Sequence, residues 1–218
     1  MAPSLHVERG LLEARCAHLA CVDEVGRGAL AGPVTVGIVL LDRGIGPAPE
    51  RVCDSKLATP ALREELAPRI EAWCRACAVA HATNAEIDEL GIIAALRLAG
   101  RRALAMLDPQ PDLVLLDGSH DWLSTPPATL FDAPDATPPV VTRVKADLEC
   151  AGVAAASILA KVARDALMVR AAQEHPEFGW DRNKGYASAE HREAIRARGP
   201  SPLHRLSWRL DAPSTGGV

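Results

Sequence analysis

Apolar and polar positions follow one another in short runs along this chain, and these runs predict an alternating α/β order of elements. Short runs rich in β-branched residues indicate buried strands, whereas longer runs with apolar residues at every third or fourth position indicate helices. The predicted strands cover residues 19–22, 33–41, 76–82, 112–118 and 140–144, and the predicted helices cover residues 60–73, 85–90, 91–107, 152–172 and 189–198. The first two strands are close enough in sequence to form an antiparallel hairpin. A proline-rich stretch at residues 124–139 predicts an irregular loop without assigned chemistry.

Carboxylates stand at the ends of three of these predicted strands. Asp23 and Glu24 follow the first strand, Asp117 ends the strand of residues 112–118, and Asp147 follows the strand of residues 140–144. Functional groups gather at strand ends in an open α/β sheet, so we expect these four side chains to be neighbours. For each residue taken alone, the alternative is a role in a turn or a helix cap.

Four neighbouring carboxylates repel one another, and bound cations relieve that repulsion. Their hard oxygen atoms suit divalent ions such as Mg²⁺ or Mn²⁺. Two such ions roughly 4 Å apart are the known arrangement for in-line phosphodiester hydrolysis, in which one activates water and the other stabilises the leaving oxygen. The sequence therefore predicts a two-metal phosphodiesterase centre. His120, three residues after Asp117, is a candidate for assisting proton transfer there.

The hexapeptide Asp23-Glu24-Val25-Gly26-Arg27-Gly28 places a glycine-flanked arginine directly beside two of these carboxylates. Gly26 and Gly28 let the main chain approach a sugar-phosphate closely, and Arg27 supplies a positive charge. A charged surface turn after a strand is the alternative interpretation.

Composition and charge permit one compact domain that contacts nucleic acid locally. Of the 218 residues, 48% are hydrophobic, which is enough for a substantial core. No apolar run approaches the roughly 20 residues of a membrane span, and no secretory signal begins the chain, so we expect a cytoplasmic protein. The net charge of −4 argues against binding nucleic acid by bulk charge. Residues 143–210, however, carry twelve Lys or Arg and eight Asp or Glu, so the C-terminal third is basic.

The segment Trp73-Cys74-Arg75-Ala76-Cys77 has the cysteine spacing of thiol oxidoreductases. In that class the cysteine pair follows a strand and opens a helix, whereas here a predicted helix precedes the pair and a predicted strand follows it. A zinc site with Cys16 and Cys21 would have looser spacing than a typical ligand pair. We expect reduced thiols, because a chain of this size without a secretion signal does not depend on disulfides.

Six short segments, taken in their order, resemble one known family. They are Asp23-Glu24-Val25-Gly26-Arg27-Gly28, Asp54-Ser55-Lys56, Leu116-Asp117-Gly118, Lys145-Ala146-Asp147, the run of residues 155–165 and Lys184-Gly185-Tyr186. Together they are similar to ribonuclease HII over roughly residues 17–209, with Val25 where the family often has Ala and Ala146 where it often has Gly. The resemblance implies an RNase H-like α/β fold, with a central mixed five-stranded sheet flanked by helices. It divides a single domain, residues 1–218, into a catalytic core at 17–172 and a helical substrate-binding extension at 173–210.

The resemblance also implies an activity and a set of site residues. It implies a monomeric endoribonuclease that hydrolyses the RNA strand of RNA/DNA hybrids and cuts 5′ of single ribonucleotides embedded in duplex DNA, giving 3′-hydroxyl and 5′-phosphate ends. The implied catalytic and metal-binding residues are Asp23, Glu24, Asp117 and Asp147. The expected substrate contacts are Gly26, Arg27, Gly28, Ser55, Lys56, Ser157, Lys161, Arg164 and Tyr186, with a structural role as the alternative for several of them. Tyr186 is assigned to the ribonucleotide junction.

Two other functions stay open on the sequence. A ribonuclease HIII-like nuclease usually carries an extra N-terminal substrate-binding domain and lacks an arginine at the position of Arg27. We expect no such domain, because the segment before the first predicted strand is short. A non-catalytic duplex-binding module would keep the fold without the chemistry, and four intact carboxylates disfavour it.

Overall fold

The computed structural model describes residues 2–125 and 137–210 of the chain. Its strands are β1 (His18–Val25), β2 (Val34–Asp42), β3 (Ala76–Ala82), β4 (Leu113–Asp117) and β5 (Val140–Arg143). Its helices are α1 (His6–Ala14), α2 (Pro60–Trp73), α3 (Asn84–Leu90), α4 (Ile92–Ala105), α5 (Ala146–Glu149), α6 (Ala151–Glu174), α7 (Trp180–Asn183) and α8 (Ala189–Arg198), with a 3₁₀ turn, η1 (Pro176–Phe178).

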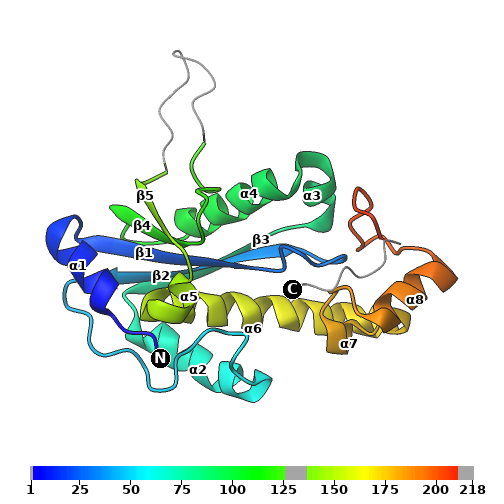
Figure 1. Ribbon diagram of the computed structural model, residues 1–218, viewed down its shortest axis with the longest axis horizontal. Helices are drawn as coiled ribbons and strands as arrows, with labels where there is room; N and C mark the ends of the chain where they lie inside the picture. The colour runs from blue at the N-terminus through cyan, green and yellow to red at the C-terminus, as the bar shows by residue number, and fades with distance from the viewer. Residues whose placement is uncertain (1, 126–136, 211–218) are drawn as a thin grey trace, which may run out of the picture.

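The strands of the described residues form one mixed sheet in the order β3-β2-β1-β4-β5 (Figure 1). The first three strands pair antiparallel, whereas β4 lies parallel to β1 and β5 lies parallel to β4. Val22 of β1 stands opposite Leu116 of β4 in this register. Because β1 and β4 are parallel neighbours, their carboxyl ends lie at the same edge of the sheet.

Helices cover both faces of the sheet. α6 runs along one face together with α1 and α2, and α3 and α4 cover the other (Figure 1). Successive strand residues point to opposite faces, so each central strand contributes to two cores. Cys21 and Leu41 pack on the α6 side, while Val22 and Ile38 pack on the α4 side.

Small residues let α6 approach the sheet closely. A Cβ atom at Gly37 would lie 2.3 Å from the carbonyl oxygen of Ala156, and one at Gly152 would lie 2.6 Å from the sulfur of Cys21. Either contact is far shorter than packed atoms allow, so glycine is required at both positions. The close approach brings Ser157 of α6 against the end of β1.

The C-terminal elements pack at the far end of α6 and are tied to the segment after β1. Trp180 of α7 belongs to an apolar cluster with Met168 of α6 and Leu30. The backbone N–H of Leu30 donates to the carbonyl of Gly185 at 2.8 Å, and its carbonyl accepts the N–H of Arg205 at 2.9 Å. The basic extension is therefore joined by main-chain hydrogen bonds to the residues that follow the first two carboxylates.

The structure confirms the fold class and most predicted elements. The sheet is mixed and five-stranded, it begins with the antiparallel hairpin, and α2, β3 and α8 have the predicted bounds. Helix α1, which buries Leu12 beside the sheet, is not among the predicted elements. Residues 126–136 of the proline-rich loop lie outside the described residues. Within residues 2–125 and 137–210, no helix is both long enough and apolar enough to span a membrane.

The prediction that Asp147 stands at a strand end is wrong. The sequence analysis places Asp147 at the end of a strand, but β5 ends at Arg143 and Asp147 lies in the first turn of α5. The chain changes direction at Lys145, whose φ of 60° lies in the left-handed region. A non-glycine residue in that region is uncommon, and no hydrophobic pattern signals it.

Candidate active site

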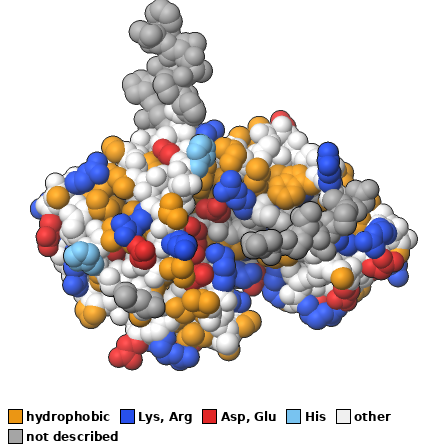
Figure 2. Space-filling model, viewed as in Figure 1, with side chains coloured by type: hydrophobic (Ala, Val, Ile, Leu, Met, Phe, Trp, Pro, Cys, Tyr) orange, Lys and Arg blue, Asp and Glu red, His pale blue; other side chains and the backbone are white. Residues whose placement is uncertain are grey.

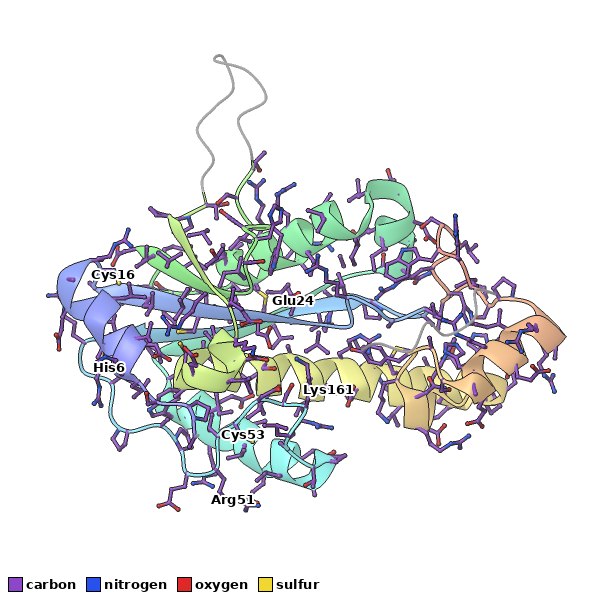
Figure 3. All side chains as sticks on the ribbon, viewed as in Figure 1. His6, Cys16, Glu24, Arg51, Cys53 and Lys161 are labelled. Atoms are coloured by element: carbon purple, nitrogen blue, oxygen red, sulfur yellow. The ribbon has the colours of Figure 1, made fainter. Side chains whose placement is uncertain are left out.

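The four predicted carboxylates meet at the edge of the sheet where β1 and β4 end. Asp23 and Glu24 belong to the last residues of β1, and Asp117 is the last residue of β4. Asp147 reaches this edge from α5. The carboxylate of Asp117 accepts the backbone N–H of Ala146 at 2.7 Å, which ties α5 to the end of β4. Figure 3 labels Glu24 at this point on β1.

Burial and mutual repulsion raise the pKa values of three of these carboxyl groups. Burial raises the pKa of Asp23 to about 8; a hydrogen bond from Ser157 opposes this rise, and the charges of Glu24 and Asp117 add to it. Burial also raises the pKa of Glu24, and burial followed by the charge of Asp147 raises that of Asp117. Carboxyl groups that resist ionisation because of their neighbours favour a cation between them.

The donor atoms of this cluster fit a hard divalent cation, because they are carboxylate oxygens. A cationic group already lies beside them: Lys56 Nζ is 3.4 Å from Asp147 Oδ2. Figure 2 shows acidic and basic side chains next to one another in the middle of the visible face. Among the described residues, no three carboxylate, imidazole or thiolate groups converge as metal ligands in their present rotamers.

The loop of residues 54–56 is anchored to α6 beside the carboxylates. The hydroxyl oxygens of Ser55 and Ser157 lie 2.8 Å apart, and both side chains are buried. Arg63 donates to the carbonyl of Ser55 at 2.8 Å, and it lies 3.6 Å from the carboxylate of Asp165 on α6. Lys56 by contrast leaves 76% of its side chain exposed. The loop thus holds an exposed ammonium group above an anchored backbone.

The glycine-flanked segment is held against Tyr186 of the C-terminal extension. The backbone N–H of Gly26 donates to the hydroxyl of Tyr186 at 3.1 Å. Gly26 has a φ of 88°, and a Cβ atom there would lie 2.1 Å from Arg164 Nε, so only glycine fits. Gly28 is exposed, and no atom lies within 4 Å of where its Cβ would be. Arg27 is half exposed, 3.4 Å from the carboxylate of Glu24.

Comparison with known proteins identifies the family that shares this arrangement. The family described as Ribonuclease HII matches residues 20–211 of the chain. The chain belongs to the ribonuclease HII family. A ribonuclease HII of Streptomyces avermitilis is 47% identical over 212 residues, which cover 96% of this chain and 85% of the relative.

Solved structures agree with this assignment. The ribonuclease H2 of Pyrococcus horikoshii OT3 has a TM-score of 0.67 at 29% identity, covering 89% of this chain and 95% of the other. A Bst-RNase HIII solved in complex with Mn²⁺ has a TM-score of 0.66 at 21% identity, covering 93% of this chain and 70% of the other, which is a likeness of fold alone. Members of the ribonuclease HII family are endonucleases that act on RNA/DNA hybrids. The non-catalytic and oxidoreductase alternatives are therefore set aside.

One expected substrate contact of this ribonuclease HII family member lies away from solvent. Arg164 is fully buried, and its guanidinium donates to the carbonyls of Pro33 and Lys184 at 2.9 Å and of Ala31 at 3.2 Å. Its nitrogen atoms are occupied by backbone oxygens, so the expectation that Arg164 contacts a phosphate is wrong for this structure. Its position instead fixes the backbone on either side of the glycine segment.

Lys161 lies near the glycine-flanked segment, and its ammonium group forms an ion pair within α6. Its ammonium is 2.8 Å from the carboxylate of Asp165, as the helical spacing predicts, and 5.5 Å from the ring centroid of Tyr186. Figure 3 labels Lys161 on α6, the helix that runs beside β1. Lys161 and Lys56 are thus the lysine ammonium groups at the edge of the site.

Sequence reasoning missed a group of buried polar residues that hold this site together. Arg205 is fully buried and donates to the carbonyls of Gly26 at 2.6 Å, Arg27 at 2.8 Å and Gly32 at 3.2 Å. His191 and His204 are buried as well. No local sequence pattern marks these buried polar side chains, because their hydrogen-bond partners belong to other elements of the fold.

Proposed function

We propose that this ribonuclease HII family member cuts 5′ of single ribonucleotides in duplex DNA as well as within the RNA strand of hybrids. Two Mg²⁺ or Mn²⁺ ions held by Asp23, Glu24, Asp117 and Asp147 would serve the reaction, which leaves 3′-hydroxyl and 5′-phosphate ends. One observation carries the proposal: the sheet edge with four carboxylates continues directly into a backbone segment that is hydrogen-bonded to Tyr186.

The carboxylates supply the chemical half of the site. Divalent cations bound there lower the pKa of the attacking water and stabilise the leaving oxygen. Asp23 is fixed by its burial and by Ser157, whereas Asp117 is fixed by the backbone of α5. Rigid placement of charged groups reduces the reorganisation needed in the transition state. Lys56, now beside Asp147, would move to a substrate phosphate when cations arrive.

The glycine segment and Tyr186 supply the sugar-reading half. Gly28 is exposed, and the space where its Cβ would stand is open, so a sugar can approach its backbone without a clash. The ring of Tyr186 is 36% exposed, and its hydroxyl is already aligned by the N–H of Gly26. A 2′-hydroxyl can donate and accept, so it can replace or extend this hydrogen bond, whereas deoxyribose cannot.

Residues farther from the centre complete the proposed contacts with the duplex. Arg27, Lys56 and Lys161 present positive charge toward phosphates, and Ser55 and Ser157 act mainly by positioning because both are buried. We assign the catalytic core to residues 17–172 and duplex binding to the extension 173–210. The enzyme would act as a monomer in the cytoplasm.

The direct test uses a DNA duplex that contains one ribonucleotide, beside an all-DNA duplex of the same sequence. With Mg²⁺ or Mn²⁺ we expect a single cut on the 5′ side of the ribonucleotide, no cut in the control duplex, and no cut in EDTA. Absence of that cut with both metals would sink the proposal. Cleavage that persists in EDTA would refute the role of the cations while leaving the substrate assignment standing.

A further inference from the structure

Two buried histidines of the C-terminal extension face one another directly. His191 of α8 and His204 are both fully buried, and their Nε2 atoms lie 3.1 Å apart. Phe178 and Trp180 surround them, with ring centroids 4.6 Å from His204 for Phe178 and 6.1 Å from His191 for Trp180. A contact between two imidazole nitrogens requires one to donate and the other to accept. The remaining partners decide which nitrogen carries each hydrogen.

The hydrogen-bond partners allow one assignment of tautomers. The backbone N–H of Ser201 donates to His204 Nδ1 at 2.9 Å, so this nitrogen is an acceptor and neutral His204 carries its hydrogen on Nε2. His191 Nε2 then accepts from His204, and it also accepts from the indole N–H of Trp180 at 3.0 Å. His191 therefore carries its hydrogen on Nδ1, which donates to the carbonyl of Tyr186 at 2.8 Å.

This histidine pair completes a closed series of hydrogen bonds, here called the circuit, around the sugar-reading segment, Gly26 to Gly28. His191 holds the backbone of Tyr186, the hydroxyl of Tyr186 accepts the N–H of Gly26, and the carbonyl of Gly26 accepts from Arg205. Arg205 directly follows His204, whose ring donates back to His191. Because each link fixes the next, the distance between Tyr186 and Gly26 depends on the imidazole contact at the far side of the circuit.

We propose that His191 and His204 form a neutral imidazole pair that positions Tyr186 against Gly26, and so sets how well the enzyme cuts at a single embedded ribonucleotide relative to a long hybrid. They are positioning residues, since neither reaches the carboxylates or the exposed face. This inference rests on the proposed role of Tyr186 in reading the sugar. Adding a proton at His204 Nδ1 or at His191 Nε2 would place it against groups that already donate there, which breaks the circuit.

The surroundings of the pair also disfavour a positive charge. The neighbouring charged or titratable groups are Arg192 from α8, His175 at the end of α6 and Arg205 in the C-terminal segment, while η1 and α7 contribute Phe178 and Trp180. Burial, followed by the proximity of His191, lowers the pKa of His204 to about 4, and burial also lowers the pKa of His191. Both rings are therefore neutral at physiological pH.

The tautomers can be read directly on the full-length wild-type chain. Nitrogen NMR of protein labelled with ¹⁵N-histidine, recorded from pH 8 to 5, distinguishes the two neutral forms and the imidazolium, and single His→Asn variants assign the signals. We expect hydrogen on Nδ1 of His191 and on Nε2 of His204 throughout that range. Either ring in the other tautomer, or charged at pH 7, overturns the proposal, and neither result depends on activity.

Two substitutions of His191 distinguish a role in positioning Tyr186 from a role in folding stability alone. In His191→Asn the amide nitrogen stands near the place of Nδ1 and can still donate to Tyr186. In His191→Gln the amide stands near Nε2, so it can still accept from Trp180 and His204 but no longer reaches Tyr186. The readout is the ratio of cleavage rates on a single-ribonucleotide duplex and on a long RNA/DNA hybrid, alongside thermal unfolding of both variants.

We expect His191→Gln to lower this ratio about fivefold, as for the loss of one hydrogen bond, and His191→Asn to change it less than about twofold. Equal ratios in both variants and wild type would contradict the positioning role. A wild-type enzyme that does not distinguish the single-ribonucleotide duplex from all-DNA would instead contradict the proposed function, so the two failures differ. If neither variant folds, the tautomers of the wild type still decide the proposal.

Discussion

The carboxylate centre and the proposed sugar-reading segment, Gly26 to Gly28, are adjacent in sequence but are built in opposite ways. Asp23, Glu24 and Asp117 come from neighbouring parallel strands, and their like charges repel one another in a buried place. The segment from Gly26 to Gly28 is instead held by hydrogen bonds to distant parts of the chain. Arg205 donates to its carbonyls, and the hydroxyl of Tyr186 accepts the N–H of Gly26. Burial and neighbouring negative charge disfavour ionisation in the first region, whereas several backbone groups of the second are already hydrogen-bonded before substrate arrives.

Under the proposed function, this difference separates two tasks of the enzyme. A cluster that needs cations remains inactive without them, so the chemistry is conditional on metal. A rigid, pre-bonded segment can discriminate a single hydroxyl group, because a substrate that lacks it leaves polar groups unpaired. We therefore expect substitutions in the first region to abolish cleavage of every substrate, and substitutions in the second to change which substrate is preferred.

The largest effect is expected from Asp117→Asn. The substitution removes a metal-binding charge without changing the shape of the side chain, and we expect cleavage of both substrates to fall by about a thousandfold or more. Asp42→Asn, at the opposite end of the same sheet, serves as the matched control and should keep wild-type rates. Single-turnover cleavage in Mg²⁺ measures both. An Asp117→Asn enzyme with normal activity would remove Asp117 from the site.

The same variant should not lose stability in the absence of metal. Burial and the charge of Asp147 raise the pKa of Asp117, which means that its ionised form is disfavoured in the folded protein. Neutralising it relieves repulsion, so the melting temperature without metal should stay equal or rise. Added Mg²⁺ or Mn²⁺ should stabilise the wild type more than the variant, because binding to the folded state alone raises stability. Thermal denaturation with and without metal checks both expectations.

A smaller but still large effect is expected from Arg205→Met. Three buried carbonyls lose a charged donor, each such hydrogen bond contributing about 1 to 3 kcal/mol, and we expect the free energy of unfolding to fall by roughly 3 to 4 kcal/mol. Arg209→Met is the control, since Arg209 is exposed in the same segment. Urea denaturation of the two variants gives the comparison. Equal stability of both would show that the carbonyl contacts of Arg205 are not important for the fold.

The buried histidine pair should make stability depend on pH. Unfolded imidazoles titrate near pH 6.5, whereas burial lowers the pKa of His204 to about 4 in the folded protein. As pH falls, the unfolded state therefore takes up protons first. The stabilising contribution is complete above about pH 6.5 and is lost as pH falls toward 4, at a cost of about 2 to 3 kcal/mol.

The raised pKa of Asp23 makes the folded state more stable as pH falls over part of this range, which opposes the effect of His204. The contribution of His204 is therefore measured as the difference in stability between wild type and a variant. We expect His204→Gln to remove the loss between pH 6.5 and 4, while His120→Gln, an exposed control, keeps it. Denaturant unfolding at several pH values measures this difference. Parallel curves for wild type and His204→Gln would show that His204 titrates normally.

The smallest effect is expected from Tyr186→Phe. The ring stays between the side chains of Lys161 and Arg164, but the N–H of Gly26 loses its acceptor. We expect cleavage at a single ribonucleotide to fall about fivefold relative to a long hybrid, which corresponds to one hydrogen bond of about 1 kcal/mol. Tyr186→Ala should lower the ratio further, and equal losses on both substrates would argue against a role at the junction.

The carboxylate centre and the segment from Gly26 to Gly28 also differ in how well the sequence predicts them. The carboxylates could be predicted because each stands beside an apolar run whose type and direction are visible locally, and only the placement of Asp147 on α5 needed the left-handed turn at Lys145. The support of the sugar-reading segment could not be predicted. Arg205 acts through carbonyls that lie 173 to 179 residues away in the chain, and a buried arginine bound to carbonyls has the same local pattern as an exposed one. His191 and His204 are near one another in sequence, but no periodic pattern marks their contact.

The most direct test of this division measures single-turnover cleavage by wild type, Asp117→Asn and Arg205→Met on two substrates, a single-ribonucleotide duplex and a long RNA/DNA hybrid. We expect Asp117→Asn to lose activity on both substrates by the same large factor. Arg205→Met, assayed below its melting temperature, should keep most of its activity on the hybrid while losing the single-ribonucleotide substrate. Equal losses on the two substrates for Arg205→Met would contradict the separation of chemistry from sugar recognition.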